Sequence, residues 1–508
     1  MDPDDAHTAC LKQKTNLQRL NLWWQWRNQD EVNTELEQAV LDGLQPPPCI
    51  KELQIGRYSG RKYAWWMQNR VDGGVQGLPQ FSCLTTMTLW RFPNLKHLEE
   101  IVELPCLVNL CLSDMPSLVS ISGGPFPSLV KIVMSRLTIL GELWMIAERT
   151  MPDIEEGGGC SNCTGQVQVG NCVTDLEIID CPKLKVMPYL PSTLKYLRLS
   201  GSNVRLSGSS EPVLSEVAGL GSGRGWEMLQ HMTALESLEI RYSDVLTELP
   251  ESLGSLTSLK NLDLTRCSAI RKLPESLGEL QSLQKVGIMM CWSLSSLPQS
   301  MGQLTSLQEL YLGWCSLHEL PECLGELRSL RKLMIQELPG LTCLPESMCR
   351  ITSLEELDMR ECSALRHLPE CLGELCSLRS LYIGGCNLSS LPQSLQHLTS
   401  LQELNVGRCE AFRQLPECIG ELRSLRTLSV ICLPGLTCLP QSMCRLTSLE
   451  ELMIFGCLGI TSLPGWIKDL TTLKKLSLIG CPDLARRCER GNGEDWHLIS
   501  HIPELVFF

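Results

Sequence analysis

Leucine recurs with a fixed period through the second half of the chain. Ten leucine–proline pairs, from Leu249-Pro250 to Leu463-Pro464, follow one another at intervals of 23 or 24 residues. Self-similarity at such a period is typical of a solenoid, because one unit cannot bury its apolar face alone and must stack on its neighbours. The apolar positions of one unit are Leu259, Leu262, Leu264, Cys267, Ile270, Leu273, Leu277 and Leu280.

Each unit predicts a strand followed by a short helical turn. Alternation directs Leu262 and Leu264 inward and Asp263 outward. Pro274 has no backbone N–H to donate to a neighbouring strand, so it ends the extended segment. A helical turn then follows, from which Leu277 faces the core. This is the pattern of the leucine-rich repeat. It predicts an α/β solenoid, a leucine-rich-repeat horseshoe with a parallel β-sheet on the concave face and short helices or turns on the convex face.

Cysteine follows the strand in eight units, at a position that otherwise holds asparagine in this repeat. A small, weakly polar side chain can sit inside the turn and face backbone groups. We therefore expect buried, reduced thiols there rather than disulfides. These ladder cysteines are Cys267, Cys291, Cys315, Cys362, Cys386, Cys409, Cys457 and Cys481.

The leucine pattern divides the chain into four segments. Unequal repeat spacing in the second segment predicts longer loops on the outer face. The segments are 1–80 (irregular repeats and N-terminal cap), 81–230 (irregular repeats with two flexible loops, 151–172 and 200–225), 231–481 (regular repeats of 23 or 24 residues) and 482–508 (C-terminal cap).

Tryptophan gathers in the first segment, although aromatic residues make up only 5% of the chain. Strands are expected there at 17–22 and 50–55, with a helix at 31–44 between them. We expect the rings to cover the first edge of the sheet or to fill an irregular core; a binding patch is the alternative. The cluster comprises Trp23, Trp24, Trp26, Trp65 and Trp66.

Composition narrows the choice of partner. The net charge of −13, without a stripe of arginine or lysine, argues against a nucleic-acid partner. No run of about 18 apolar residues exists, so no membrane span is expected. The first residues lack the apolar segment of a secretion signal, which together with reduced thiols favours the cytoplasm.

Motifs for catalysis or cofactor binding are missing from the sequence. It contains no G-x-x-x-x-G-K-[ST] phosphate loop, no H-E-x-x-H and no G-x-S-x-G. The cysteines at 160, 163, 172 and 181 are not spaced as two close pairs, so a zinc site is not expected. We predict neither an enzyme nor a cofactor or metal site.

The outward positions of the strands remain as the candidate site. They vary between units while the leucines do not, and many are large apolar or aromatic residues, which favours a protein-binding surface over incidental variation. Tyr311, Trp314, Asp358, Arg360 and Tyr382 lie on nearby units and are the predicted hot spot. The full set is Tyr242, Asp263, Met289, Tyr311, Trp314, Met334, Asp358, Arg360, Tyr382, Arg408, Met453 and Phe455.

Several segments resemble the repeat region of plant nucleotide-binding leucine-rich-repeat (NB-LRR) disease-resistance proteins of the coiled-coil class. The resemblance covers nearly the whole chain. The segments that carry it are Leu17-Gln-Arg-Leu-Asn-Leu-Trp23, Val40-Leu-Asp-Gly-Leu-Gln-Pro46, Ile50-Lys-Glu-Leu-Gln-Ile55, the Leu-Pro-Glu-Ser-Leu-Gly units, Cys488-Glu-Arg-Gly-Asn-Gly-Glu-Asp-Trp496 and His501-Ile-Pro503.

The resemblance implies recognition of a pathogen effector or of a guarded host protein, and restraint of a nucleotide-binding switch. The coiled-coil and nucleotide-binding domains that precede the repeats in this family are absent from the sequence. We therefore expect this module to work in trans with a nucleotide-binding domain. The alternative is a general intracellular leucine-rich-repeat scaffold that binds small GTPases or signalling proteins.

Overall fold

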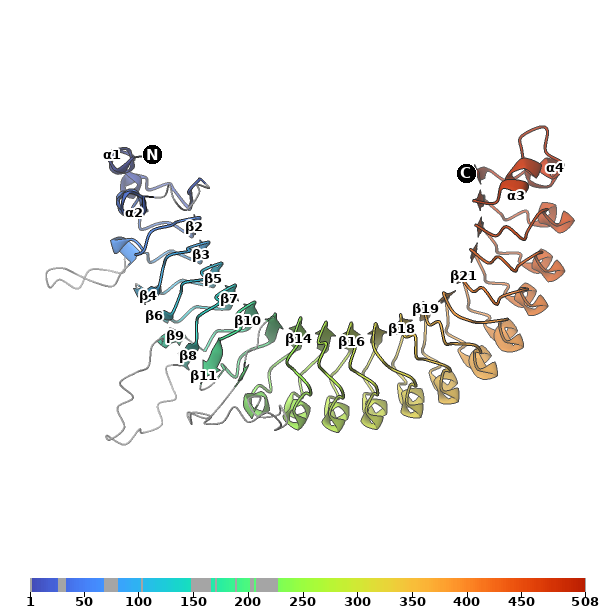
Figure 1. Cartoon of the computed structure of the whole chain (residues 1–508), viewed down its shortest axis with the longest axis horizontal. Helices are drawn as coiled ribbons and strands as arrows, with labels where there is room; N and C mark the ends of the chain where they lie inside the picture. Colours follow the sequence, from blue (N-terminus) through green and yellow to red (C-terminus); the bar gives the residue numbers. More distant parts are fainter. Residues whose placement is uncertain are drawn as a thin grey trace. The chain divides into compact units, whose positions relative to one another are not determined.

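The computed structural model describes residues 2–25, 33–67, 81–101, 104–147, 166–169, 171–187, 190–201, 205–206 and 227–507. The chain forms two compact units, Met1–Leu259 (unit 1) and Lys260–Phe508 (unit 2). Each unit is built on a parallel β-sheet to which successive repeats contribute one strand each (Figure 1).

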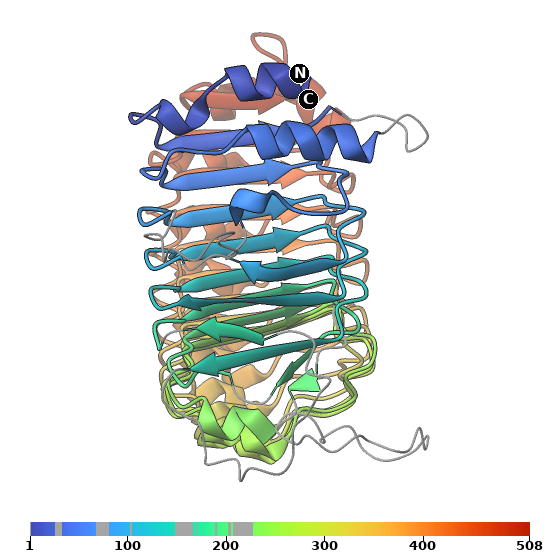
Figure 2. The same cartoon turned by 90° about the vertical axis from the view of Figure 1, so that its left-hand side faces the viewer.

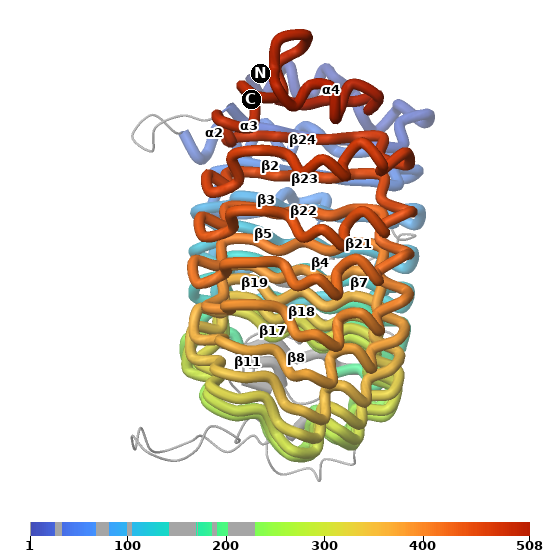
Figure 3. The backbone as a smooth tube through the Cα atoms, turned by 90° about the vertical axis from the view of Figure 1, so that its right-hand side faces the viewer, coloured from blue at the N-terminus to red at the C-terminus, as the bar shows by residue number. Residues whose placement is uncertain are grey.

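Unit 2 confirms the predicted repeat. Its strands pair in chain order, and Figure 3 shows its coils stacked one on the next. The strands line the inner side of this unit's curve and the turns its outer side (Figure 1). The strands are β15 (Asn261–Thr265), β16 (Lys285–Met289), β17 (Glu309–Gly313), β18 (Lys332–Gln336), β19 (Glu356–Arg360), β20 (Ser380–Gly384), β21 (Glu403–Gly407), β22 (Thr427–Ile431), β23 (Glu451–Phe455), β24 (Lys475–Ile479) and β25 (Glu504–Phe507).

The outer side of unit 2 consists of short 3-10 helices, each of which begins directly after a proline of a leucine–proline pair. At these prolines φ lies between −63° and −72°, the angle that the proline ring imposes. The helices are η6 (Glu275–Glu279), η7 (Gln299–Gln303), η8 (Glu322–Glu326), η9 (Glu346–Arg350), η10 (Glu370–Glu374), η11 (Gln393–His397), η12 (Glu417–Glu421), η13 (Gln441–Arg445) and η14 (Gly465–Asp469).

Glutamate and glycine explain how these turns stack. The carboxylate of Glu417 accepts a hydrogen bond from the backbone N–H of Ser442 in the next turn, at 2.9 Å, and Glu275 contacts Ser300 in the same way at 3.0 Å. A Cβ atom on Gly373 would lie 2.2 Å from the carbonyl oxygen of Ser394. The Leu-Pro-Glu-x-x-Gly pattern therefore serves turn-to-turn packing, as its repetition with the unit indicates.

The ladder cysteines are buried, free thiols, as predicted. Cys315 donates to the carbonyl oxygens of Gly313 and Ile288, at 3.2 and 3.7 Å, and so satisfies backbone acceptors inside the turn. A disulfide that the sequence did not indicate joins Cys349 in η9 to Cys371 in η10. These two cysteines lie on the outer turns and are not part of the ladder.

Unit 1 also has one parallel strand per repeat on one side, as predicted (Figure 2). Its first sheet begins with the two strands expected near the N-terminus and continues through the irregular repeats. In spatial order the strands are β1 (Arg19–Trp23), β2 (Glu52–Gly56), β3 (Thr86–Trp90), β5 (Asn109–Ser113), β7 (Lys131–Ser135), β10 (Asp175–Ile179), β12 (Tyr196–Ser200) and β14 (Ser237–Arg241).

The expectation of long loops on the outer face of the irregular repeats was wrong for part of unit 1. A second parallel sheet forms there, and β9 and β13 fall within the segments expected to be flexible loops. Most other residues of those loops lie outside the described part of the chain. In spatial order this sheet comprises β4 (His97–Ile101), β6 (Ser120–Phe126), β9 (Gln166–Val169), β8 (Glu142–Ala147), β11 (Lys185–Met187) and β13 (Arg205–Leu206).

Helices occur at both ends of the chain. Residue Ala6 of the first helix packs with Val40 and Leu44 in a small apolar cluster. At the other end Leu498, Ile499 and Ile502 are buried next to the last turn, where the sequence predicts a cap. Besides η6 to η14, the helices of the described residues are α1 (Pro3–Thr8), η1 (Leu11–Gln13), α2 (Thr34–Gly43), η3 (Trp65–Met67), η4 (Glu227–His231), η5 (Glu251–Ser255), α3 (Pro482–Arg487) and α4 (Trp496–Ile499).

Candidate functional site

The sheet of unit 2 presents its outward residues in rows that cross the strands. The third residue of each strand forms the middle row and the fifth forms the end row, because parallel pairing aligns equivalent positions. Of the predicted residues, the middle row contains Asp263, Tyr311, Met334, Asp358, Tyr382 and Met453, and the end row contains Met289, Arg360 and Phe455.

Three predicted residues lie just beyond the strands. Trp314 and Arg408 in unit 2 and Tyr242 in unit 1 each follow the last residue of a strand and have φ between 51° and 56°. At this position in unit 2, the backbone N–H groups from Arg266 to Gly456 donate to the next strand, as Trp314 does to the oxygen of Gln336 at 3.1 Å. This extra hydrogen bond holds non-glycine residues in a left-handed conformation that they rarely adopt.

The predicted hot spot is contiguous in the structure. Tyr311 pairs with Met334, Met334 with Asp358, and Asp358 with Tyr382 across four neighbouring strands. Arg360 lies two residues beyond Asp358 on the same strand, and Trp314 follows the strand of Tyr311. The five residues therefore occupy one part of the strand face.

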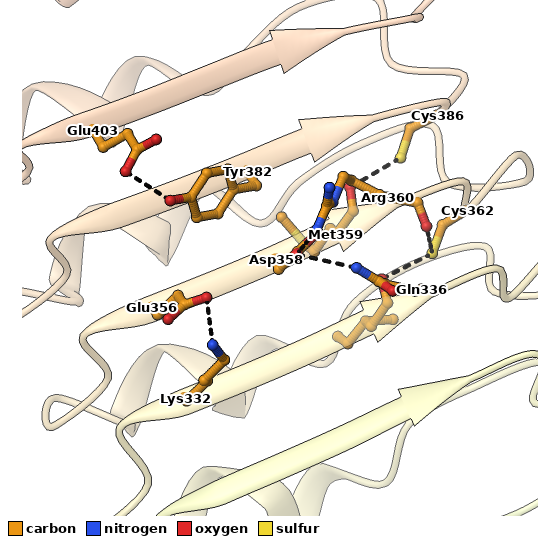
Figure 4. A network of polar contacts seen from close by, with 11 residues as sticks. Lys332, Gln336, Glu356, Asp358, Met359, Arg360, Cys362, Tyr382, Cys386 and Glu403 are labelled. Carbon is orange, nitrogen blue, oxygen red and sulfur yellow. Dashed lines mark hydrogen bonds and ion pairs between the residues drawn. The ribbon is translucent and has the colours of Figure 1, made fainter. Parts of the chain in front are cut away.

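Asp358 holds Arg360 in place rather than offering its own carboxylate at the surface. It is only 2% exposed, and its two oxygens accept hydrogen bonds from Arg360 Nε at 2.8 Å and Nη2 at 2.5 Å (Figure 4). Gln336 Nε2 donates to the same carboxylate at 3.1 Å. The hydrogen bonds that Arg360 donates to Asp358 raise the pKa of its guanidinium, which lies 5.9 Å from the ring centre of Tyr382.

The two tyrosines are also held by neighbours on the sheet. Tyr311 donates to Glu309 Oε2 at 2.9 Å, and Tyr382 donates to Glu403 Oε2 at 2.6 Å. Burial of the ring, together with the acceptor carboxylate, raises the pKa of each tyrosine to about 12. Lys285 Nζ lies 4.8 Å from the ring centre of Tyr311. Both rings are half-buried and ordered before any partner arrives, which lowers the entropic cost of binding.

A hollow of about 350 Å³ opens beside the hot spot, over strands β17 to β22. Gly384 and Gly407 occupy neighbouring end-row positions and bring no side chains to it. Their occurrence at consecutive end-row positions is the sequence signal that could have revealed the hollow. It is lined by Trp314, Gln336, Glu337, Arg360, Glu361, Ile383, Gly384, Asn405, Gly407, Arg408 and Ile431.

The N-terminal tryptophans divide between core and surface. Trp66 is fully buried and donates to the carbonyl oxygen of Leu41 at 3.1 Å, and Trp24 packs against the core cluster near the first helix. Trp23 and Trp65 are more than half exposed. Trp66 and Trp24 thus fill the core, which is one of the two expected roles, whereas Trp23 lies on the first strand with its ring against Trp90; Trp26 lies outside the described residues.

Other expectations concern metals and membranes. Within the described residues no group of His, Cys, Asp and Glu could hold a metal ion. Cys181 is a buried ladder residue and Cys172 is exposed, whereas positions 160 and 163 lie outside the described part. The same part of the chain includes no helix with the length and apolar character needed to cross a membrane.

Comparisons with known families identify the repeats. Residues 1–115 match a family described as R13L1/DRL21 LRRs. Residues 221–339 match a family described as a leucine-rich repeat region, and residues 377–398 match a single leucine-rich repeat.

Plant proteins are among the curated relatives. "Putative disease resistance protein RGA1" of Solanum bulbocastanum is 30% identical over 269 residues, which are 49% of this chain and 23% of that protein. "Putative disease resistance RPP13-like protein 1" of Arabidopsis thaliana is 29% identical over 127 residues, 24% of this chain and 11% of that protein. The chain thus spans less than a quarter of the length of these relatives.

Among solved structures, the Toll–Spatzle complex of Drosophila contains a chain with the same fold. It aligns with 95% of this chain and 56% of its own length at a TM-score of 0.54 and 16% identity. This likeness concerns the repeat architecture alone.

Proposed function

From a leucine-rich-repeat chain related to the repeat region of plant NB-LRR disease-resistance proteins, we propose a protein-recognition module of plant innate immunity. It binds a pathogen effector or a guarded host protein through the strand face of unit 2, and it works in trans with a nucleotide-binding domain. Recognition involves no catalysis, cofactor, nucleic acid or membrane. We place the module in the cytoplasm because its ladder thiols are free; the Cys349–Cys371 disulfide lies outside the ladder, on the outer turns.

The observation that carries the proposal is the continuous row from Tyr311 to Tyr382 with Arg360 beside it. Tyrosine, tryptophan and arginine are the residues most enriched in binding hot spots, and Tyr311, Tyr382, Trp314 and Arg360 are of these types. Because Asp358, Glu309 and Glu403 fix the arginine and both tyrosines through hydrogen bonds, the surface is largely preorganised. A preorganised aromatic surface on a sheet suits capture of a folded protein.

A quadruple alanine substitution at Tyr311, Trp314, Arg360 and Tyr382 tests the proposal. Asp358 is left intact because it is only 2% exposed and still accepts a hydrogen bond from Gln336 when Arg360 is replaced. The matched control replaces Trp292 and Leu458, which are 51% and 63% exposed and lie outside the proposed surface. Thermal unfolding of all three proteins is measured alongside.

Capture is measured by co-expression with the nucleotide-binding domain of a related disease-resistance protein, with and without candidate effectors. We expect the parent and the control to capture the same partner, and the quadruple variant to lose at least about tenfold in affinity. Equal capture by the quadruple variant would refute the proposed surface. Capture of small GTPases in place of these partners would favour the scaffold alternative.

A further inference from the structure

The hollow beside the hot spot is a recess in the sheet surface itself. Gly384 is its most open point, because a Cβ atom there would meet nothing closer than Gly407 O at 3.4 Å and Arg360 Cγ at 3.5 Å. Side chains on both sides stand higher, with Arg360 before the glycines and Ile431 after them. Its volume of about 350 Å³ is at the small end of ligand pockets, a size that suits one protruding side chain.

Both arginines of the hollow already have acidic partners. Arg360 is bound by the two oxygens of Asp358, and Arg408 Nη1 lies 3.1 Å from Glu361 Oε1. An acidic ligand would have to compete with these carboxylates and would approach Glu337 as well. The hollow therefore does not favour a carboxylate.

Glu337 is the one acidic residue of the hollow whose carboxylate makes no hydrogen bond or ion pair with any residue that the structure describes. It is half-buried, and it follows its strand at the same register position as Trp314 one unit earlier and Glu361 one unit later. Neighbouring strands lie about 4.8 Å apart, so the indole and the two carboxylates are spaced along one edge of the hollow. A half-buried charge without a partner is a place where a ligand cation gains most.

We propose that this hollow accepts an arginine side chain from the recognised polypeptide. The guanidinium stacks on Trp314 and pairs with Glu337, and a neighbouring apolar residue of the ligand packs on Ile431. A guanidinium combines stacking on an indole with hydrogen bonding to carboxylates, which neither lysine nor a neutral amide does equally well. The net charge of −13 also favours the approach of a basic segment. This inference rests on the proposed function and names the chemistry of its ligand.

Glu361 can form a second ion pair with the guanidinium of the ligand's arginine. Its pair with Arg408 is exposed, at 40% and 69% of the two side chains, and such surface pairs contribute at most about 1 kcal/mol. Exchange of Arg408 for the ligand's arginine therefore costs little. The tightly held Arg360, in contrast, remains with Asp358 and marks the opposite wall.

The test uses the full chain labelled with 5-fluorotryptophan, with the Trp314 signal assigned by a Trp314→Phe variant. The probes are acetyl-arginine amide, its uncharged analogue acetyl-citrulline amide, and acetyl-glutamate amide. We expect a saturable shift of the Trp314 fluorine signal with the arginine probe only. In Glu337→Gln the apparent affinity should fall about fivefold, while the exposed outer-side substitution Glu374→Gln should leave it unchanged.

Three results would overturn the inference: an equal shift with citrulline, a shift with the glutamate probe instead, or full arginine binding by Glu337→Gln. Because this titration contains no protein partner, it is independent of the capture experiment. Capture without arginine binding would refute only the role of the hollow. Arginine binding together with undiminished capture by the quadruple variant would instead refute the proposed recognition surface.

Discussion

The two units are alike on the side that carries the strands and differ on the outer side. In β10 of unit 1 and β15 of unit 2, buried residues alternate with partly exposed ones in the same pattern over five residues. On the outer side, unit 2 has a 3-10 helix after each of its periodic leucine–proline pairs, whereas part of unit 1 has a second parallel sheet. The strand side thus depends only on the leucine alternation, and the outer side depends on the residues that connect one strand to the next.

Local chemistry explains the difference. In unit 2 a proline such as Pro416 ends the extended segment, and a 3-10 turn begins at the glutamate that follows it. The carboxylate of this glutamate, Glu417, accepts a hydrogen bond from the backbone N–H of Ser442 in the next turn. The corresponding outer segments of unit 1 contain residues such as Trp144 and Ile146 of β8, which favour strands. Neighbouring repeats then pair these segments because their backbone groups require partners.

The largest loss of stability is expected from matched substitutions on the strand side of each unit. Leu381→Ala in β20 and Leu176→Ala in β10 each remove a fully buried side chain from the same strand position. We expect each to lower the free energy of local unfolding by about 2–5 kcal/mol, measured by hydrogen exchange of the altered strand and its neighbours. A much smaller loss in unit 1 would show that its strand side is not equivalent to that of unit 2.

A smaller effect, confined to unit 2, is expected from glycine substitutions on the outer side. Gly373→Ala places a Cβ atom against the backbone oxygen of Ser394, and we expect a loss of about 1–3 kcal/mol in hydrogen-exchange stability of the two turns. Gly141→Ala in unit 1 is the control, since nothing lies within 4 Å of the added atom. Equal losses at both positions would contradict the packing difference between the outer sides.

The smallest effect concerns the glutamates that bridge the turns. The backbone N–H of Ser442 lowers the pKa of Glu417 from its ordinary value of 4.5. The folded pKa is the lower one, so this stabilisation is present above about pH 4.5 and is lost as the pH falls through the folded pKa.

Glu417→Gln should therefore destabilise the turn by less than about 1 kcal/mol at neutral pH and have no effect in strong acid. Chemical denaturation as a function of pH measures both, with the exposed Glu374→Gln as the control. A loss that persists at the lowest pH would show that the carboxylate's charge is not responsible.

Much of the candidate site could be predicted from alternation, but its chemistry could not. The repeat period predicts that Tyr311, Asp358 and Tyr382 lie in one row, because equivalent positions of successive repeats pair across neighbouring strands. It did not reveal that Asp358 is buried beneath Arg360, or that Glu337 borders a hollow. Both depend on which side chains stand on the adjacent strands, about one repeat away in the sequence.

The sequence by itself determined the repeat, the inward leucines, the buried thiols and the turns after each proline, because each follows from the conformational preferences of a few neighbouring residues. Only the tertiary structure decided which outward residues are accessible, where Gly384 and Gly407 open the surface, and that unit 1 forms a second sheet. These outcomes depend on contacts between successive coils, whose strengths no single repeat contains.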